Sequence, residues 1–154
     1  RLEKLAESAL NYHAENIRIR RGDVTELELP PVNGVLLDAP CTGTGVIGKR
    51  ADLRWRRTPE ELAAIVQLQS KLLAQAATMV AKGGRLVYST CSLEPEENWE
   101  QVQAFLAKHK GFELESLADY LPEEVLIEGG KAYQTLPHKH GCDGHFGVRL
   151  IRKS

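Results

Sequence analysis

Apolar positions along the chain alternate between short continuous runs and longer stripes of helical spacing. The runs at 34–38 and 85–90 have the length and composition of strands that are buried on both faces of a parallel sheet. Between them, a capping box at Thr58–Glu61 begins an apolar stripe that reaches Val80, before Lys82 and two glycines end it. Strand, helix and strand in this order predict a parallel crossover of an α/β fold.

Weaker patterns predict the flanking elements. An amphipathic helix is expected in residues 1–13, and the alternation in Asn16–Arg20 predicts a strand that turns at Asp23. A further helix should begin by Pro95, bury Trp99, Val102, Phe105 and Leu106, and close at Lys110–Gly111. Residues 112–116, 132–136 and 146–151 are strand-like, and the last two predict an antiparallel hairpin at one side of the sheet.

Length and composition indicate one globular domain that covers residues 1–154, since the chain is 42% hydrophobic and 27% charged and has no linker-like stretch. Its three cysteines are odd in number and far apart, which argues against a disulfide framework. The sequence contains no pattern typical of a signal peptide or a membrane span. We therefore expect a reducing, cytoplasmic location and no membrane partner.

The net charge of −1 excludes a uniformly basic nucleic-acid coat, but it hides a local basic cluster. The cluster comprises Lys49, Arg50, Arg54, Arg56 and Arg57, which are opposed only by Asp52. From charge alone a solvated face is the favoured interpretation, and binding of a polyanion stays open. Trp55 lies within the cluster and fits either a stacking platform or the core.

The candidate chemistry lies at the ends of the two central strands. Asp38 ends the first strand and is followed by Pro40-Cys41, and the second strand ends on Cys91. Since ligands of parallel sheets bind at the carboxyl ends of strands, Cys41 and Cys91 are expected near one another. Taken singly, Cys91 is more typical of a small buried hydrophobe, and an acid such as Asp23 is more typical of a turn.

Two other motifs are weaker. Gly43–Lys49 contains both G-x-G-x-x-G and G-x-x-x-x-G-K, which are patterns of nucleotide binding, but four residues separate the strand from the first glycine, and Arg50 replaces the expected Ser or Thr. The turn with His138, His140, Cys142 and His145 contains zinc-ligand residue types in a spacing that matches no familiar zinc module. We expect no metal, and nucleotide binding remains an alternative function.

Several motifs together, in order and in spacing, resemble one family. These are DAPCTGTGVI, DLRW, TPEEL, KGGRLVYSTCS, PEEN and PHKHGCDGHF. They resemble the RNA cytosine carbon-5 methyltransferases of the Sun, Fmu and NOL1-NOP2 class, and best the bacterial enzymes for 16S ribosomal RNA. The resemblance implies part of a class I, Rossmann-like methyltransferase sheet with a C-terminal antiparallel hairpin. The first strands and the cofactor loop of that fold are missing, so we expect the C-terminal portion of a catalytic domain.

The resemblance also implies roles for single residues. Cys91 matches the family nucleophile and Cys41 the cysteine that assists product release. Asp23, Asp38 and Pro40 are expected at the S-adenosylmethionine pocket, and Asp38 also at the target base.

The resemblance further implies methylation of carbon 5 of cytosine in RNA, most naturally ribosomal RNA, through a covalent cysteine adduct. Arg54 and Arg57 are expected to bind the RNA backbone. This portion alone is expected to be inactive, and a non-catalytic RNA-binding module is a further alternative.

Overall fold

The computed structural model describes residues 2–26 and 29–154 and contains one six-stranded mixed sheet. The strand order is β1-β2-β6-β5-β4, and β3 pairs with β6. Only β1 and β2 are parallel, and all other pairs are antiparallel. The strands are β1 (Val32–Asp38), β2 (Val80–Thr90), β3 (Phe112–Leu114), β4 (Leu126–Ile127), β5 (Ala132–Thr135) and β6 (His145–Arg152). The predicted parallel pair and the predicted C-terminal hairpin, β5 and β6, are both confirmed.

Within the described residues, four α-helices and five short 3₁₀ segments precede or connect these strands. The α-helices are α1 (Leu2–Asn11), α2 (Pro59–Thr78), α3 (Trp99–Lys108) and α4 (Pro137–His140), and the 3₁₀ segments are η1 (Val24–Glu26), η2 (Thr44–Val46), η3 (Ala51–Trp55), η4 (Glu123–Val125) and η5 (Glu128–Gly130). The predicted capping box is confirmed, because the Thr58 hydroxyl accepts a hydrogen bond of 3.2 Å from the Glu61 amide. None of the helices in these described ranges is long and apolar enough to cross a bilayer.

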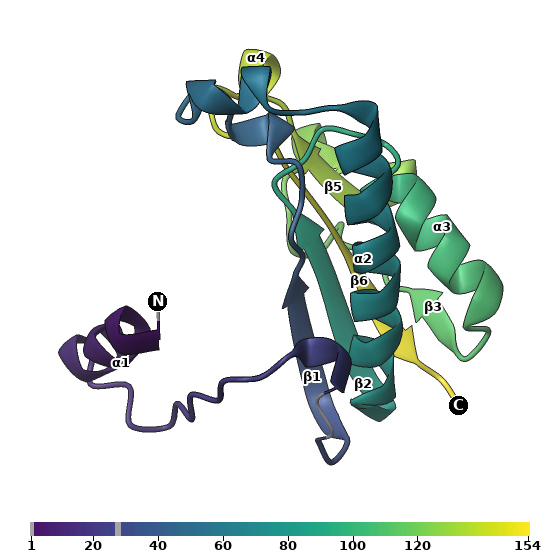
Figure 1. Cartoon of the computed structure of the whole chain (residues 1–154). Coiled ribbons are helices and arrows are strands. Elements are labelled where there is room, and N and C mark those ends of the chain that lie inside the picture. Colours follow the sequence, from purple (N-terminus) through teal and green to yellow (C-terminus); the bar gives the residue numbers. More distant parts are fainter. Residues whose placement is uncertain (1, 27–28) are drawn as a thin grey trace.

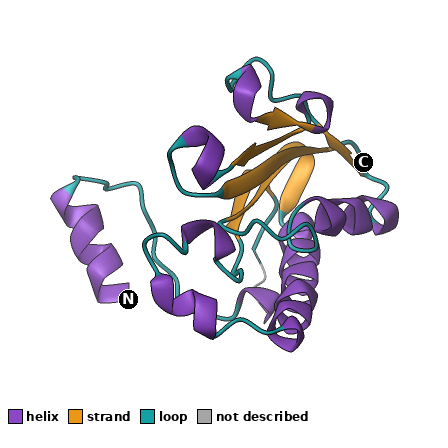
Figure 2. Ribbon diagram, turned by 90° about the horizontal axis from the view of Figure 1, so that it is seen from above, coloured by secondary structure: helices purple, strands orange, loops and turns teal. Residues whose placement is uncertain are grey.

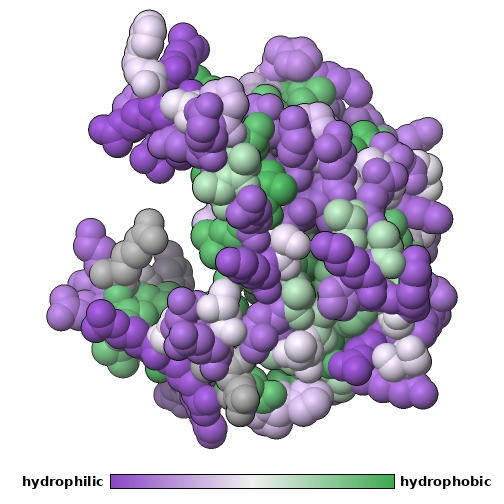
Figure 3. Space-filling view, turned by 45° about the vertical axis from the view of Figure 1, so that its right-hand side comes forward, coloured by the Kyte–Doolittle hydropathy of each residue, from purple (hydrophilic) through white to green (hydrophobic). Residues whose placement is uncertain are grey.

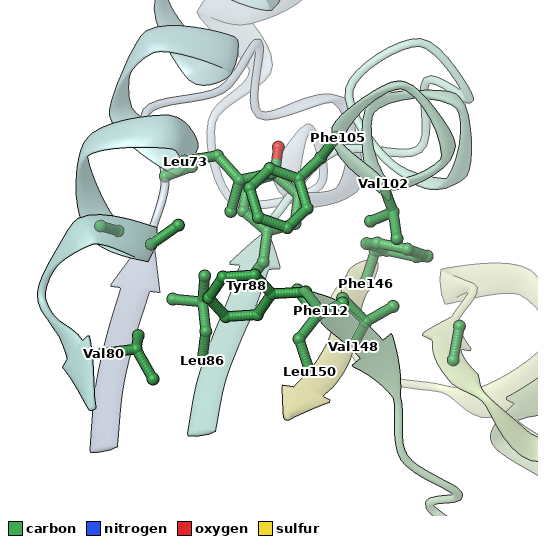
Figure 4. Packing of buried hydrophobic residues seen from close by; sticks show 14 residues of the cluster. Leu73, Val80, Leu86, Tyr88, Val102, Phe105, Phe112, Phe146, Val148 and Leu150 are labelled. Carbon is green, nitrogen blue, oxygen red and sulfur yellow. The ribbon is translucent and has the colours of Figure 1, made fainter. Parts of the chain in front are cut away.

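The core lies between the sheet and the two long helices, α2 and α3 (Figures 1 and 4). Leu73 from α2 and Phe105 from α3 meet Leu86 and Tyr88 from β2 and Phe146 from β6, all of them buried (Figure 4). Burial of apolar surface on this scale is the main force that holds the helices to the sheet.

The first strand is less buried than its sequence predicts. β1 is the last strand at one side of the described sheet, and Val32 and Leu36 are 40% and 70% exposed. The prediction that it is buried on both faces is therefore wrong for this structure: Val35 and Leu37 are partly buried against the core, but within residues 2–26 and 29–154 no strand pairs with the outer side of β1. In Figure 3, green hydrophobic surface is visible in the hollow between the part of the molecule that projects at the top and the N-terminal segment below it.

Three predicted boundaries are also corrected. Asn16–Arg20 forms no strand, because alternation becomes a strand only when a neighbouring strand pairs with it, and none does so in the described residues. Val80 does not end α2 but opens β2, where it pairs with Val32. α3 begins at Trp99 rather than by Pro95, because residues 95–98 form turns. Figure 2, seen from above, shows α1 set apart from the sheet.

Candidate active site

Two cysteines meet at the carboxyl edge of the parallel strand pair. Asp38 of β1 pairs in register with Ser89 of β2, so the segments that follow these strands leave the sheet side by side. The Sγ atoms of Cys41 and Cys91 lie 3.1 Å apart, and both side chains are partly buried. The prediction that the two thiols lie together is confirmed, although fifty positions separate them in the sequence.

The contact between the two sulfur atoms shifts the pKa values of the two thiols in opposite directions. The Cys41 thiol donates a hydrogen bond to the Cys91 sulfur, and this bond lowers the pKa of Cys91 to about 7 against the opposing effects of burial and of the Asp38 and Glu97 carboxylates. The pKa of Cys41 is raised, because its proton is held in the same hydrogen bond and because its side chain is the more enclosed of the two. Cys91 is therefore the more acidic thiol of the pair.

A buried glycine joins the loops of the two cysteines. The Gly45 amide donates to the Cys91 carbonyl at 3.0 Å, and the Gly45 carbonyl accepts from the Gly144 amide at 2.8 Å. A Cβ atom at Gly45 would lie 2.4 Å from the Gly144 carbonyl oxygen and 2.8 Å from that of Cys91. This position therefore requires glycine for the close approach of three backbone segments.

The same geometry weighs against nucleotide binding by Gly43–Lys49. The glycines open only the three-residue segment η2, whereas phosphate loops open a long helix. The Lys49 ammonium is bound to Asp143 at 2.7 Å, and the Gly45 amide is already bound to Cys91. The donors that would hold a phosphate are thus occupied within the protein.

The sequence did not single out Glu97, whose carboxyl group accepts hydrogen bonds from the loops of both cysteines. Glu97 is fully buried, and its Oε1 accepts hydrogen bonds of 2.9 Å from both the Thr42 amide and Gln69 Nε2. Its Oε2 accepts from the hydroxyls of Thr42 and Ser92. In the sequence, Glu97 stands out only as part of the motif PEEN. A hydroxyl residue directly after each cysteine was the one local signal that pointed to a shared acceptor.

Of the acidic and cofactor candidates, two share the edge with the cysteines. Asp38 is exposed at the end of β1, where its Oδ1 accepts from the Ser89 hydroxyl at 3.1 Å. Pro40 is exposed, and its carbonyl accepts from Gln69 Nε2 at 2.9 Å. Asp23 lies exposed in the segment before β1, and both hydrogen bonds to its carboxylate come from Thr25, which lower its pKa. The structure thus brings Asp38 and Pro40 to the cysteines but leaves Asp23 with local contacts.

The basic cluster lies on η3 and the turn before α2, next to the Cys41 loop. Arg57 Nε donates to the Thr42 carbonyl at 2.6 Å, so this guanidinium is attached to the residue that follows Cys41. Arg54 is exposed, and Trp55 is 89% exposed, so Trp55 does not belong to the core. The upper projection in Figure 3, which corresponds to the top of Figure 1 where these residues lie, is mainly hydrophilic. An exposed tryptophan among arginines suits a polyanion that carries aromatic bases.

Two of the three histidines of the C-terminal turn, His140 and His145, have structural partners. His140 Nδ1 accepts from the Leu136 amide at 2.8 Å, and His145 Nδ1 bonds the Tyr133 hydroxyl at 2.7 Å. Among the described residues, no group of three or more His, Cys, Asp or Glu side chains is placed to hold a metal ion. Cys142 is exposed on this turn.

Comparisons with known proteins agree on one family. The family described as 16S rRNA methyltransferase RsmB/F matches residues 1–151. A probable ribosomal RNA small subunit methyltransferase B from Synechocystis is 39% identical over 155 residues, which cover 97% of this chain and 35% of that protein. The corresponding protein from Bacillus subtilis is also 39% identical, over 92% of this chain and 32% of its own length.

Solved structures agree with the sequence relatives. The crystal structure of NSun6 from Pyrococcus horikoshii with SFG has a TM-score of 0.87 at 32% identity, and the match covers all of this chain and 39% of that one. A methyltransferase homolog protein from the same organism has a TM-score of 0.64 at 36% identity, over 81% of this chain and 40% of its own. The fold is therefore that of the class I methyltransferases.

These matches cover nearly the whole of this chain but only part of the other proteins. The chain spans about a third of the length of the curated relatives it matches. Because the family match extends over residues 1–151, the chain belongs to the RsmB/F family of 16S rRNA methyltransferases.

Proposed function

We propose that this chain is the C-terminal portion of a catalytic domain that methylates carbon 5 of cytosine in ribosomal RNA, with S-adenosylmethionine as methyl donor, in the cytoplasm. The observation that carries the proposal is the 3.1 Å contact between the sulfur atoms of Cys41 and Cys91. The names of the relatives, ribosomal RNA small subunit methyltransferase B, support ribosomal RNA as the substrate. A cytosine reaches such a pocket when it is unstacked or single-stranded.

Two thiols of unequal acidity suit the two halves of this reaction. The Cys91 thiolate adds to carbon 6 of cytosine and forms a carbon–sulfur bond, which makes carbon 5 nucleophilic. After carbon 5 has accepted a methyl group and lost its proton, the carbon–sulfur bond breaks and its electron pair returns to Cys91. The Cys41 thiol donates a hydrogen bond to the sulfur that departs, as it does to the free thiolate. Cys41 therefore assists product release in this proposal.

The edge of the sheet where β1 and β2 end carries an exposed carboxylate beside the cysteines, which suits a cationic cofactor. Asp38 keeps one carboxylate oxygen free of the Ser89 hydroxyl and is open to solvent, and Pro40 lies exposed beside it. S-adenosylmethionine supplies the methyl group when it is bound. We propose that Asp38 and Pro40 line its pocket and that Asp38 also binds the polar edge of the base. We also propose that Asp23 lines this pocket in the complete catalytic domain.

The RNA surface in this proposal is the basic cluster around Trp55. Arg54 is free to contact phosphates, and Trp55 offers an exposed face on which an RNA base can stack. Arg57 is held by the Thr42 carbonyl and, at 3.5 Å, by Glu61, so it can contact a phosphate close to the Cys41 loop. These contacts would position the strand without reading its sequence.

The proposal is tested by trapping the covalent intermediate. In the complete catalytic domain, Cys41→Ala should block release and leave RNA attached through Cys91, which is seen as a slower band in denaturing electrophoresis. The double variant Cys41→Ala with Cys91→Ala should show no adduct. Cys142→Ala is the matched control, because this third cysteine is exposed on the C-terminal turn, and it should behave as the wild type. Methylation that persists after Cys91→Ala would remove the proposed mechanism.

A further inference from the structure

The Glu97 carboxyl group binds the residue that follows each of the two cysteines. Thr42 follows Cys41 and Ser92 follows Cys91, and the hydroxyls of Thr42 and Ser92 both donate to Oε2 of Glu97. The Thr42 amide donates to Oε1 at 2.9 Å, so the Cys41 loop is held by backbone as well as by side chain. A single buried side chain thus binds both segments that bear the thiols.

The carboxyl group is itself fixed in the core. The Glu97 carbonyl accepts from the buried hydroxyl of Tyr88 at 2.7 Å, which ties residue 97 to β2. Gln69 from α2 donates to Oε1 of Glu97 and to the carbonyl of Pro40, each at 2.9 Å. The acceptor that joins the two loops is therefore also attached to β2 and α2.

We propose that Glu97 is a positioning residue, which sets the separation of the Cys41 and Cys91 sulfur atoms by binding Thr42 and Ser92 with one carboxyl group. The catalytic meaning of this separation rests on the proposed function, but the separation itself does not. Burial of a carboxyl group is costly unless hydrogen bonds compensate for it, and here four donors do so. A mere surface acid would not be placed between the two thiol-bearing segments.

If Glu97 acts through its position, its replacement should change the pKa of Cys91 in a different way than if it acts through its charge. The pKa of Cys91 is lowered mainly by the Cys41 hydrogen bond, whereas the negative charges of Glu97 and Asp38 raise it. If Glu97 acted only through its charge, Glu97→Gln would lower the pKa of Cys91 further, and Glu97→Asp would leave it unchanged. If Glu97 acts by position, both variants loosen the sulfur contact, and the pKa of Cys91 rises toward the value of about 8.5 of a free thiol.

The experiment is a pH profile of alkylation on this chain, read separately for each cysteine by mass spectrometry. Iodoacetamide is the probe, and the midpoint of the profile is used rather than a single rate, because a more acidic thiolate is also less nucleophilic. The variants are Glu97→Gln, which keeps the size of the side chain, and Glu97→Asp, which keeps its charge. Glu96→Gln is the matched control, since Glu96 is exposed on the same turn. Circular dichroism on each variant reports whether it is folded.

We expect a wild-type midpoint near 7 for Cys91, the same value in Glu96→Gln, and a rise of about one pH unit or more in both folded Glu97 variants. A midpoint that falls in Glu97→Gln and stays constant in Glu97→Asp would overturn the proposal in favour of charge. Unfolding would also raise the midpoint, so Ser92→Ala decides if the Glu97 variants do not fold. It removes the Ser92 hydroxyl from Oε2 of Glu97, together with the 3.1 Å contact of this hydroxyl with Thr42, and leaves the carboxyl group three donors. A folded Ser92→Ala protein with an unchanged midpoint would equally refute the inference.

None of these readings requires turnover or RNA. The proposed function can therefore fail, with no adduct through Cys91, while the role of Glu97 stands. The reverse result, an adduct in the Cys41→Ala domain together with a Glu97 variant whose alkylation midpoint equals that of the wild type, would remove only the role of Glu97.

Discussion

Replacing Gly45 by alanine should both destabilise the chain and separate the two cysteines. The added methyl group would lie 2.4 Å from the Gly144 carbonyl oxygen and 2.8 Å from the Cys91 carbonyl oxygen. Both neighbours are backbone atoms, so no flexible side chain can move aside. The Cys41 loop must withdraw from the Cys91 loop and from the turn that contains Gly144.

The magnitude follows from the bonds that this withdrawal breaks. The hydrogen bonds between Gly45 and Cys91 at 3.0 Å and between Gly144 and Gly45 at 2.8 Å would both be lost. Each contributes about 1 kcal/mol net, and overpacking of a close contact costs about 1–3 kcal/mol more. We therefore expect the free energy of unfolding to fall by about 3–5 kcal/mol. With a urea m-value of about 2 kcal/mol per molar, the midpoint moves down by about 1.5–2.5 M.

The assay is urea unfolding of this chain followed by circular dichroism, with Gly48→Ala as the matched control. Gly48 belongs to the same loop, but a Cβ atom there meets nothing within 4 Å. The control should unfold within about 0.5 kcal/mol of the wild type. Equal midpoints for the two alanine variants would show that Gly45 is not the close contact between the cysteine loops and would refute the reasoning.

Four further predictions follow from the same geometry. Oxidised glutathione should form a disulfide between Cys41 and Cys91, whose sulfurs lie 3.1 Å apart, and leave exposed Cys142 out of it; a peptide map that shows Cys142 in the bridge would contradict the contact. The free energy of unfolding of the wild type, measured relative to that of Cys41→Ala, should rise from pH 7 to about 9. The folded pair of thiols releases its first proton near pH 7, whereas the thiols of the unfolded chain keep their protons up to a pH of about 8.5. Above that pH it should fall, because folded Cys41 retains its proton; a flat difference in urea titrations would refute the linkage. Trp55→Ala should weaken binding of single-stranded RNA about 5- to 100-fold in filter binding, as stacking contributes about 1–3 kcal/mol per base, while Tyr12→Ala, at an equally exposed aromatic, should not. S-adenosylmethionine should bind this chain weakly or not at all in calorimetry, and micromolar affinity would contradict the expected need for an upstream cofactor loop.

The elements with strong local signals were predicted well. Thr58 accepts the capping hydrogen bond that its sequence indicated, and the second central strand ends at Thr90 as expected. Helix α2 ended earlier than its apolar stripe suggested, because Val80 is equally apolar in a helix or a strand and pairing with Val32 decided between them. The alternation at Asn16–Arg20 misled, since a strand needs a partner that local sequence does not contain.

The candidate site was predicted in part. Cys41 and Cys91 could be placed together, because two parallel strands put their carboxyl ends at one edge. The buried role of Glu97 and the attachment of Arg57 to the Thr42 carbonyl were not visible in the sequence. Arg57 lies 15 positions from Thr42, and Glu97 lies 55 positions from Thr42 and 28 from Gln69, so no local periodicity connects these partners.

The order of the elements, the apolar faces and the presence of two cysteines after two strands are properties of the sequence itself. They arise from local periods and turn residues, which act within a few positions of one another. The tertiary structure decided which thiol has the lower pKa, which glycine forms a close contact and which carboxyl group joins the loops of the two cysteines. These depend on distances and burial between segments far apart along the chain, and such quantities exist only after the sheet and its helices have packed.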